Sequence, residues 1–567
     1  MLIWKYQDQS GDSYVDSSIH PVVGRLLLQR GIKEREAIQC FLTPQYERDF
    51  FDPFLFRAME RVVERIGAAR INEEKVGIFG DFDADGVTSS IILRDTLTAL
   101  GLEVVLYLPH KIDEGHGLNL HALDTFEKAG VKLFLTLDCG MMNHAEILEA
   151  KKRGLDAIII DHHHVPEVLP EAFAIINPKL PNETYPFRDL CGAGTSFKVA
   201  SALYQRFLPD QVEQLKWLLD VAAIGTVADV MPLLGENRAM VKYGLVVLSK
   251  TRRVGLQEMF AVGRIPHGED SFFDAHTIAF QIAPRINAAS RMAHPQLAHD
   301  LLWEADRVKA RGLALELEAY NVARQKVSQE TSQTVKRVAE TKFQDKKFIF
   351  AVGPEYPLGV IGLVAGKIAR EFGKPTCILQ RGDKTSTGSF RSIPGLNIIE
   401  AIEASGELLE KFGGHEQAAG MTILNSNLEA FYEQFNAFIE KKLATITLEP
   451  ELWIDLILEP TEITPKLARD LTQLAPFGEG NREPVFALQD ITVVEARAVG
   501  KDGQHWKLKL KNGSEPKTFD AVGWSLVESF PGLHAGEHID IAFELSENVW
   551  NGRTDLQLKL RDIRRLS

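Results

Sequence analysis

The chain has 567 residues, which is too long for a single hydrophobic core, so several domains are expected. Its composition, 45% hydrophobic and 25% charged residues, is ordinary for a globular protein and excludes a low-complexity polymer. The net charge of −14 argues against a broadly basic surface that coats nucleic acid, but it leaves room for a local groove.

Several other classes are excluded by simple patterns. No run approaches the ~20 apolar residues that a membrane helix needs. The first residues, MLIWKYQDQS, lack the charged and apolar regions of a signal peptide, so we expect a cytoplasmic protein. The cysteines are scattered without a CxxC pair, which argues against a zinc knuckle or a disulfide framework; they are Cys40, Cys139, Cys191 and Cys377.

The N-terminal part is mixed in pattern. We expect residues 1–45 to form an extension packed on the first domain, with a short helix at residues 22–29. Apolar residues at helical spacing then predict a helix over residues 57–71. This helix would lead into a first domain that we place at residues 46–295.

Four apolar runs between residues 75 and 161 are short, unbroken and rich in Val, Ile and Leu, which is typical of strands covered on both faces. The runs are residues 76–79, 104–108, 133–137 and 157–160, and segments of helical length separate them. Strands alternating with helices predict a parallel sheet, whose ligands bind beyond the carboxyl ends of its strands. Those ends should therefore bring together Asp81, Asp83, Asp85, Asp138, Asp161 and His162.

Carboxylates packed at strand ends repel one another unless a cation neutralises them. Asp83 and Asp85 directly follow a buried run, and histidines accompany Asp161, so we favour a metal site over a structural acid cluster. Oxygen ligands with one or two imidazoles suit Mn²⁺ or Mg²⁺, and imidazole tilts the choice toward Mn²⁺. Two such ions ~3.5–4 Å apart, bridged by a carboxylate, form a common centre for hydrolysing phosphoesters.

The α/β pattern continues beyond residue 161. Residues 173–176 predict a further strand, and a glycine-bearing turn at residues 191–195 precedes a helix over residues 197–207. That turn lacks the G-x₄-GK[ST] order of a phosphate-binding loop, so we interpret it as a tight turn against the sheet. Residues 215–224 predict a helix ending near Asp229, an acid that matters only if it reaches the same site.

The segment QIAPRINAASR at residues 281–291 is predicted to form a loop. Residues 304–341 then predict a helix on the order of 55 Å long. Its apolar stripe is interrupted and much of its surface is charged. This suits a connecting helix, placed at residues 296–342, between two domains.

A second, smaller α/β domain is predicted at residues 343–446. Its strands are expected at residues 348–352 and 376–379, and its helices at residues 360–372, 398–412 and 428–443. Two glycine-bearing loops, GSFRS and GGHEQAAG, offer backbone amides, an arginine and a histidine to an anion. Turns without a ligand are an equal alternative for either loop.

The pattern changes to short strands and turns after Pro450, so residues 447–567 are predicted to form a small β barrel or sandwich. Strands are expected at residues 491–498, 506–510 and 539–545. Alternation in WKLKLK puts Lys507 and Lys509 on one face and apolar residues on the other. A solvated strand face is the commoner explanation, and a basic stripe that tracks a single strand is the alternative.

Three of these motifs resemble the DHH phosphoesterase superfamily: DFDADG at residues 81–86, LDCG with Asp138, and DHH at residues 161–163. With GTVADV, PRINAASR, GSFRSI and GGHEQAAG, the chain from about residue 79 onward is similar to that superfamily's single-strand-specific 5′→3′ DNA exonucleases. The resemblance implies a parallel-sheet DHH domain, a long helix, a smaller DHH-associated domain and a C-terminal OB-fold barrel. It also implies release of 5′-mononucleotides by hydrolysis with two Mn²⁺ or Mg²⁺ ions, in DNA repair and recombination.

The resemblance assigns roles around the metals. It implies that Asp138 bridges the two ions, that Asp161 orients His162, and that His163 faces the scissile phosphate. Arg285 and Asn287 match a loop that contacts substrate near the metals. The implied metal ligands are Asp83, Asp85, Asp138, His162 and Asp229, with Asp81 as a further candidate.

The resemblance also implies how the strand is held. Residues of the DHH-associated domain would grip the 5′ end and the neighbouring phosphates: Ser389, Arg391, Gly413, Gly414 and His415. The barrel, with Lys507 and Lys509, would guide the strand. Lys111 and His116 stand where the family commonly has Arg and Tyr, and Leu358 replaces an often polar residue. Lysine keeps the charge without the bidentate fork, so we expect a looser grip on a 5′ phosphate.

Two other functions remain open. A small-substrate phosphodiesterase of dinucleotides or short oligonucleotides would share both α/β domains but would not need the barrel. A non-catalytic replication or repair scaffold would be expected to lose ligands, whereas every motif acid is present. The expected partners are single-stranded DNA and, for work in duplex DNA, a helicase and a single-strand-binding protein. A monomer is expected because no heptad run indicates a coiled coil.

Overall fold

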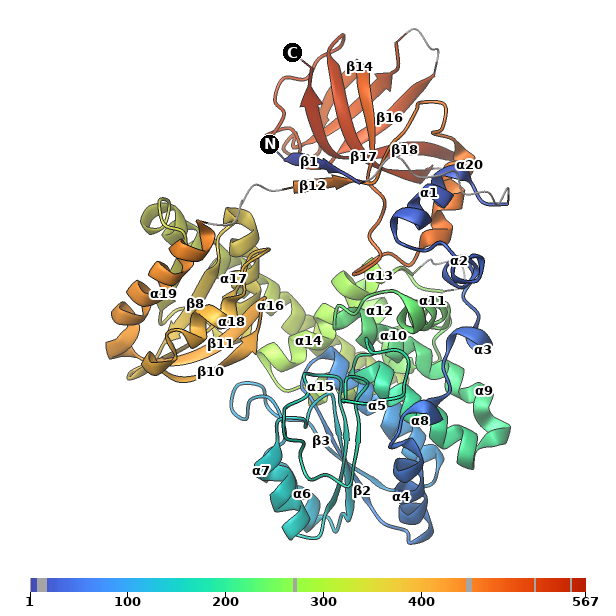
Figure 1. The fold of residues 1–567 in the computed structure, drawn as a ribbon, viewed down its shortest axis with the longest axis vertical. Coiled ribbons are helices and arrows are strands. Elements are labelled where there is room, and N and C mark those ends of the chain that lie inside the picture. Colours follow the sequence, from blue (N-terminus) through green and yellow to red (C-terminus); the bar gives the residue numbers. More distant parts are fainter. Residues whose placement is uncertain are drawn as a thin grey trace. The chain divides into compact units, whose positions relative to one another are not determined.

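The computed structural model describes residues 2–7, 18–268, 273–444, 451–513, 517–550 and 553–566. They form two compact units (Figure 1), which we call the α/β unit, Phe51–Met231 with Tyr243–Leu448, and the barrel unit, Met1–Phe50 with Pro232–Lys242 and Glu449–Ser567. Among these residues, no helix combines the length and the apolar character that a membrane span needs. The boundary predicted at Pro450 lies outside the described residues.

The first sheet of the α/β unit is parallel throughout, as predicted, with strand order β3-β2-β4-β5-β6. Every residue of β2 and β4 is buried, which explains why these strands read as unbroken apolar runs. Helices α6 and α7 cover one face, while α4, α5 and α8 lie on the other (Figure 1). The strands are Val76–Gly80 (β2), Val104–Tyr107 (β3), Leu133–Leu137 (β4), Asp156–Ile160 (β5) and Ala174–Ile176 (β6). The helices are Met59–Ile71 (α4), Ala84–Ala99 (α5), Leu120–Lys128 (α6), His144–Lys152 (α7) and Gly192–Phe207 (α8).

A helical layer follows this sheet in the chain. The long helix is confirmed as α16, Arg307–Lys342. The loop predicted at residues 281–291 is wrong, because Pro284 lies in the first turn of helix α14, where a missing N–H costs nothing. The other helices of this layer are Leu219–Ala228 (α10), Gly235–Ser249 (α11), Val254–Gly263 (α12), Ala275–Thr277 (α13), a π-helical turn at Ile278–Ile282, and Gln296–Trp303 (α15).

The second lobe of the α/β unit has a mixed sheet in the order β10-β11-β9-β8-β7. Helices α16 and α17 pack on one face, and α18 and α19 on the other. The helix predicted at residues 398–412 is wrong in its second half, since α18 ends at Glu403 and β10 begins at Leu409. The strands are Ile349–Gly353 (β7), Thr376–Arg381 (β8), Thr385–Arg391 (β9), Leu409–His415 (β10) and Ala418–Leu424 (β11), and the helices are Leu358–Phe372 (α17), Ile398–Glu403 (α18) and Leu428–Leu443 (α19).

The barrel unit contains the predicted OB-type barrel. Its strands run in the order β14-β15-β16-β18-β17, and pairing of β14 with β17 closes the barrel. The predicted alternation in β15 is confirmed, with Trp506 buried and Lys507 and Lys509 exposed. The strands are Leu456–Ile457 (β13, added to the edge), Phe486–Val499 (β14), His505–Lys511 (β15), Thr518–Gly523 (β16), His538–Trp550 (β17) and Arg553–Arg565 (β18).

The prediction that the N-terminal extension packs on the first domain is wrong. Strand β1 (Ile3–Tyr6) pairs in parallel with β12 (Glu451–Ile454). Helices α1 (Pro21–Gln29) and α2 (Arg35–Leu42) share a hydrophobic core with α20 (Pro465–Leu471) and the barrel. Arg238, from Pro232–Lys242, is fully buried in the same unit and donates hydrogen bonds to the carbonyls of Phe41, Gln473, Leu474 and Ala475. These partners lie far along the chain, so no local pattern records them.

Candidate metal centre

The acids of the first motif are held in place by the start of helix α5. Asp83 caps the helix, since its Oδ1 accepts the N–H groups of Asp85 and Gly86 at 2.9 and 3.1 Å. The Asp85 carboxylate accepts the N–H groups of Gly192 and Ala193 at 2.6 and 2.9 Å. These amides open helix α8, so the positive end of its dipole stabilises the Asp85 charge.

The other acids come from the ends of β4, β5 and α10 and meet around one imidazole. His162 Nε2 lies 3.1 Å from Asp138 Oδ1, 3.5 Å from Asp229 Oδ2 and 3.8 Å from Asp85 Oδ2. These atoms of His162, Asp138 and Asp229 are buried and have no hydrogen-bond partner among the described residues. Leaving a buried polar atom unpaired costs roughly 1–3 kcal/mol. A divalent cation bound by these oxygens and the imidazole would satisfy all of them.

Potential ligand atoms within 4.8 Å of one another form three overlapping groups: Asp81, Asp83 and Asp138; Asp85, His162 and Asp229; and Asp138, His162 and His163. The structure thus brings all six predicted ligands together, and His163 joins them. Asp138 and His162 each belong to two of these groups. The two oxygens of the Asp138 carboxylate could bind two ions, whereas one nitrogen of His162 could bind only one.

Burial and neighbouring carboxylates disfavour the charged acids. Together they raise the pKa of Asp85 to about 6 and that of Asp229 to about 9, and they raise the pKa of Asp138 well above its usual value. Burial and the nearby charge of His163 lower the pKa of His162 to about 3, which keeps its ring neutral and able to bind a metal. A bound cation would stabilise all the carboxylates in their ionised form.

The expected role of Asp161 as the partner of the His162 ring is wrong. Asp161 Oδ1 lies 2.8 Å from His163 Nδ1 and accepts the N–H groups of His162 and His163, while Oδ2 accepts that of Met141. Burial alone would raise the pKa of Asp161, but its contacts with His163 hold that pKa below the usual range. Asp161 therefore fixes the ring of His163, and it fixes His162 only through the backbone.

Two glycines belong to the site although the sequence indicated only a turn at Gly192 and the end of a helix near Gly225. A Cβ on Gly192 would lie 2.7 Å from Asp138 Cβ, and one on Gly225 would lie 2.6 Å from Asp85 Oδ1. Both positions therefore need glycine for the carboxylates to fit. The turn predicted at residues 191–195 is in fact the first turn of α8, and it holds a protein carboxylate rather than a phosphate. Asp138 itself has φ +61°, a strained conformation often found at functional sites.

The two arginines of the PRINAASR motif lie in different surroundings. Arg285 is paired with Glu318 at 2.6 and 3.1 Å and also donates to the carbonyls of Gln281 and Gly263, so it ties α14 to α16. Asn287 Oδ1 accepts the Ala84 N–H at 2.9 Å and so positions the start of α5. Arg291, which the sequence analysis missed, is the arginine that lies near Asp83 and Arg391.

Cations gather opposite the acids. Burial and Arg291 lower the pKa of Lys111 to about 8, although Asp83 and Asp81 act against this, and Arg391 adds to the positive field. The Lys111 ammonium lies 4.7 Å from the centre of the Phe82 ring. Lys111, Arg291 and Arg391 thus form a basic cluster beside the acids, although they come from three separate segments. Such a cluster fits the phosphate groups of a substrate.

The second lobe provides Arg391 from a strand rather than a loop. Arg391 donates to Ser389 Oγ at 2.7 Å, and both side chains lie on the same face of β9. A Cβ on Gly362 of α17 would lie 2.9 Å from Arg391 Nη2, so this glycine makes room for the guanidinium. The loops predicted at residues 388–392 and 413–420 are mostly strands, because residues 388–391 pair in β9, 413–415 in β10 and 418–420 in β11, with a turn at residues 416–417.

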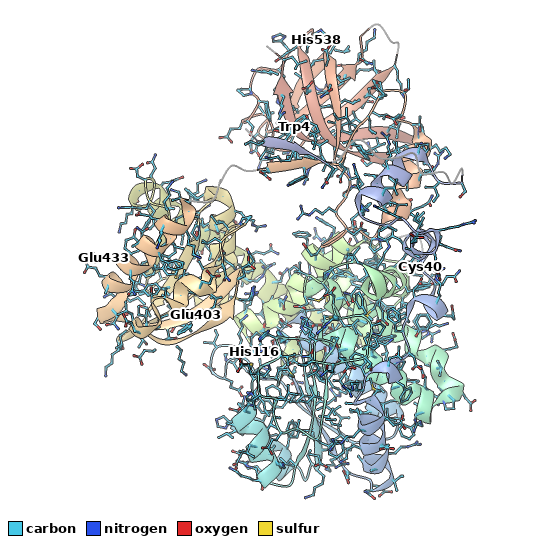
Figure 2. The ribbon with its side chains drawn as sticks, in the orientation of Figure 1. Trp4, Cys40, His116, Glu403, Glu433 and His538 are labelled. Carbon is cyan, nitrogen blue, oxygen red and sulfur yellow. The ribbon has the colours of Figure 1, made fainter. Side chains whose placement is uncertain are left out.

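The remaining predicted residues divide between the two units. His415 is exposed and lies at the end of β10, after Gly413 and Gly414. Partial burial lowers its pKa, and the nearby charges of Arg391 and His163 lower it further. His116 is labelled in Figure 2; its Nδ1 lies 3.1 Å from Asp81 Oδ1, and this contact raises its pKa to about 9. Lys507 and Lys509 lie on β15 of the barrel unit.

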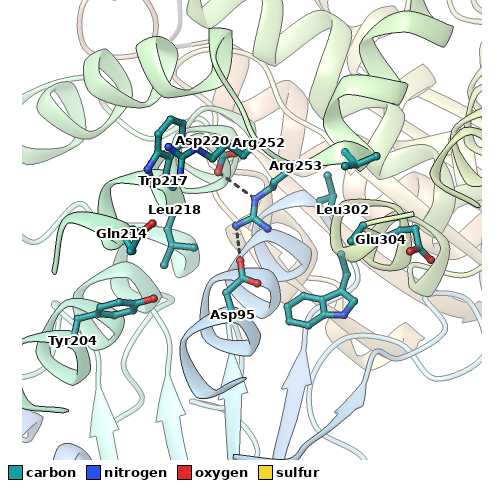
Figure 3. Close-up of a pocket in the computed structure, with 13 residues that line it drawn as sticks. Asp95, Tyr204, Gln214, Trp217, Leu218, Asp220, Arg252, Arg253, Leu302 and Glu304 are labelled. Atoms are coloured by element: carbon teal, nitrogen blue, oxygen red, sulfur yellow. Dashed lines mark hydrogen bonds and ion pairs between the residues drawn. The ribbon is translucent and has the colours of Figure 1, made fainter. Parts of the chain in front are cut away.

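A pocket of about 390 Å³ lies apart from the acids, among α5, α8, α15 and the turns beside α10 (Figure 3). Its floor is an ion-paired arginine, since Arg253 contacts Asp95 at 2.5 Å and Asp220 at 3.3 Å. The Arg252 guanidinium covers the Trp217 ring at 3.6 Å. These charged groups are already paired or stacked, so the acid cluster, and not this pocket, offers reactive groups.

Three family models match the chain in order. They are "DHH family, N-terminal domain" at residues 75–226, "DHHA1 domain" at residues 345–441 and "RecJ OB domain" at residues 454–562. The single-stranded-DNA-specific exonuclease RecJ of Bacillus subtilis is 35% identical over 566 residues, which cover 99% of this chain and 70% of that protein. Its Thermus thermophilus counterpart is 34% identical over 496 residues, which cover 87% of this chain and 69% of that protein.

Solved structures agree with these matches. The crystal structure of Thermus thermophilus RecJ in complex with Mn²⁺ superposes with a TM-score of 0.84 at 28% identity, covering 100% of this chain and 80% of that one. The Mg²⁺ complex gives a TM-score of 0.78 at 27% identity, covering 100% and 79%. The chain belongs to the RecJ family.

Proposed function

We propose that this chain is a metal-dependent exonuclease that is specific for single-stranded DNA and releases mononucleotides from the 5′ end. The observation that carries the proposal is the set of buried, unpaired ligand atoms on Asp138, Asp229 and His162 beside a cluster of cations. The names of its relatives support the substrate class, and the barrel supports a polymer substrate.

The metal ligands would be the five aspartates and the one imidazole, His162, named above. When bound, Mn²⁺ or Mg²⁺ supplies a hydroxide nucleophile at neutral pH and neutralises charge on the phosphate oxygens. Asp85 and Asp83 are fixed by backbone amides, so the ligand positions exist before substrate arrives.

His163 would act on the substrate. Asp161 holds its Nδ1 at 2.8 Å, which leaves Nε2 for a phosphate oxygen. Burial tends to lower the pKa of His163, but the hydrogen bond and charge of Asp161 raise it overall. A protonated ring can donate a charged hydrogen bond to the scissile phosphate and stabilise the charge that develops there.

Recognition of the 5′ end would fall to the basic cluster. Arg391, with Ser389 beside it, and Lys111 can bind a terminal phosphate, while Arg291 lies nearer to Asp83. Phosphate anchored beyond the metals fixes which end of the strand enters. Lysine at position 111 offers a point charge rather than a bidentate fork, so 5′-phosphate binding should tolerate other end groups.

A small-substrate phosphodiesterase would use the same metal centre. The barrel favours a polymer over that alternative, since a dinucleotide would not need a second nucleic-acid-binding domain. An enzyme of this kind in DNA repair and recombination would work in the cytoplasm on strands exposed by a helicase and coated by a single-strand-binding protein. We propose that it acts as a monomer.

Nucleotide release from end-labelled DNA tests the proposal. The substrates are a long single strand labelled at either end, its duplex, and a dinucleotide, each with Mn²⁺ or Mg²⁺. We expect early release of the 5′ label, as a mononucleotide, from the single strand. Rapid cleavage of the dinucleotide with the long strand intact would favour the small-substrate alternative, and binding without hydrolysis would favour a scaffold.

A further inference from the structure

Trp524 is a large aromatic side chain that the barrel leaves in solvent. It follows β16 and is 61% exposed. In the antiparallel pair β15–β16, Trp506 lies opposite Gly523 and Lys507 lies opposite Val522. Because side chains alternate along a strand, Trp524 continues the outer face beside His505, on the same side as Lys507. An exposed tryptophan on a charged face is more informative than a buried one.

Local structure holds the Trp524 ring outward. The rings of Trp524 and His505 meet edge to face, with centroids 4.8 Å apart. His505 is itself fixed, since its Nδ1 accepts the Ser525 N–H at 3.0 Å and a Cβ on Gly500 would lie 2.9 Å from its ring. Ser525 has φ +56°, and this sharp turn lets Leu526 pack toward the core while Trp524 stays outside. The ring is therefore presented ready for stacking, at little further cost in entropy.

The strand register separates the charges of this face into two rows. In the row next to Trp524, Arg497 lies opposite Lys507, so two cations stand side by side. In the following row, Lys509 stands between Glu495 and Asp520, its cross-strand neighbours on β14 and β16. Positive charge is thus concentrated beside Trp524. The alternating lysines of β15 therefore differ, because Lys507 has a cationic neighbour and Lys509 has acidic ones.

We propose that Trp524, His505, Arg497 and Lys507 form a single-nucleotide site on the barrel. A base of single-stranded DNA stacks on the exposed face of Trp524, with His505 supporting the ring edge, and an adjacent phosphate binds Arg497 and Lys507. Stacking uses the flat face that every base has, so the site accepts any sequence. This inference rests on the proposed function and adds the residues by which the barrel holds the strand.

The first test measures binding of the full-length protein to a labelled oligothymidylate in EDTA, where no hydrolysis occurs. Trp524→Ala should weaken binding roughly tenfold, and Trp524→Phe should retain most of it. Trp453→Ala is the matched control, because Trp453 is also exposed, at 46%, but lies on β12 away from this face. Equal affinities for Trp524→Ala and wild type, or equal losses in both alanine variants, would overturn the site.

An abasic strand distinguishes stacking from a general loss of structure. Wild type should bind the abasic strand more weakly than oligothymidylate, whereas Trp524→Ala should bind both alike. A variant that still discriminates between them would contradict base stacking at Trp524.

The charge rows make a separate prediction. Lys507→Ala should reduce the slope of log affinity against log salt by ~0.7, the value for one phosphate contact on a single strand, while Lys509→Ala should change it less. The reverse order would overturn the assignment of the phosphate to Arg497 and Lys507. Cleavage of a short oligonucleotide with Mn²⁺ should be unchanged in the Trp453→Ala control. Failure of wild type to cleave any strand would instead reject the proposed function.

Discussion

The acid cluster and the outer face of the barrel handle the same polymer in opposite ways. Asp138 and His162 are buried, fixed by backbone and glycine packing, and left with unpaired atoms. Trp524 and Lys507 are exposed, and their positions are set by the register of two strands and, for Trp524, by the local turn at Ser525. Bond cleavage needs ligands that are preorganised out of water. Holding a moving strand needs contacts that are weak, numerous and indifferent to sequence.

The largest effect should come from Asp138, a carboxylate that is shared by two ligand groups. Asp138→Asn should reduce strand cleavage on the order of 10³-fold, because several kcal/mol of charge stabilisation would be lost. Binding to a single strand in EDTA should stay within about twofold of wild type, because the barrel is untouched. Initial rates and anisotropy on the same substrate provide both readouts. An active Asp138→Asn protein would contradict the metal assignment.

Asp161 should matter less, because it acts through His163. Asp161→Asn should lower the cleavage rate roughly 10–100-fold, as the loss of a group that orients an active-site imidazole does. It should also move the pKa of His163 downward, so activity should fall at a lower pH than in wild type. A uniform loss of rate with an unchanged pH profile would indicate a purely structural role.

The two arginines of the PRINAASR motif offer an internal comparison. Arg291→Met should raise KM on 5′-phosphorylated DNA by about tenfold. A hydrogen bond to a charged group contributes roughly 1.5–3 kcal/mol, and tenfold corresponds to the lower end of that range. Arg285→Met should leave KM near wild type but lower the unfolding temperature, because its guanidinium is held by Glu318, Gln281 and Gly263. Thermal melts and steady-state kinetics on both variants measure the difference. A raised KM for Arg285→Met with an unchanged KM for Arg291→Met would indicate that Arg285, and not Arg291, contacts the substrate.

The smallest effect concerns stability and pH. Burial raises the pKa of Asp85 from 3.8 to about 6 and that of Asp229 to about 9. The metal-free protein therefore loses stability from these groups as the pH rises from about 4 through these values. A cation binds the ionised acids, so the gain in melting temperature on adding Mn²⁺ should grow by a few degrees between pH 6 and pH 9. In the control variant Asp138→Asn, Mn²⁺ should raise the melting temperature less. A rise in melting temperature that becomes smaller with increasing pH would contradict this account.

The sequence by itself determined the parallel sheet and the acids at its strand ends, whereas Asp229 joined the predicted ligands only through the family resemblance. Buried parallel strands leave unbroken apolar runs, and their carboxyl ends must share one edge, so Asp81, Asp138 and His162 had to meet. The long helix and the alternation in β15 were equally readable, because both have a local period. The OB-fold itself came from the resemblance rather than from any period.

Tertiary structure decided what depended on partners distant in the chain. Strands β9 and β10 are stabilised by pairing with β11, which is distant in the sequence from β9. Their glycine-rich sequences therefore gave no local strand pattern. Arg285 and Arg291 lie about one and two-thirds turns apart on α14, so their side chains leave the helix about 120° apart and only the folded helix shows which one lies near the acids. The partner of Asp161 and the packing of α1 were likewise fixed by contacts that no local pattern encodes. The sequence gives the chemical type of each side chain, whereas the packing of distant segments determines which neighbour that side chain contacts.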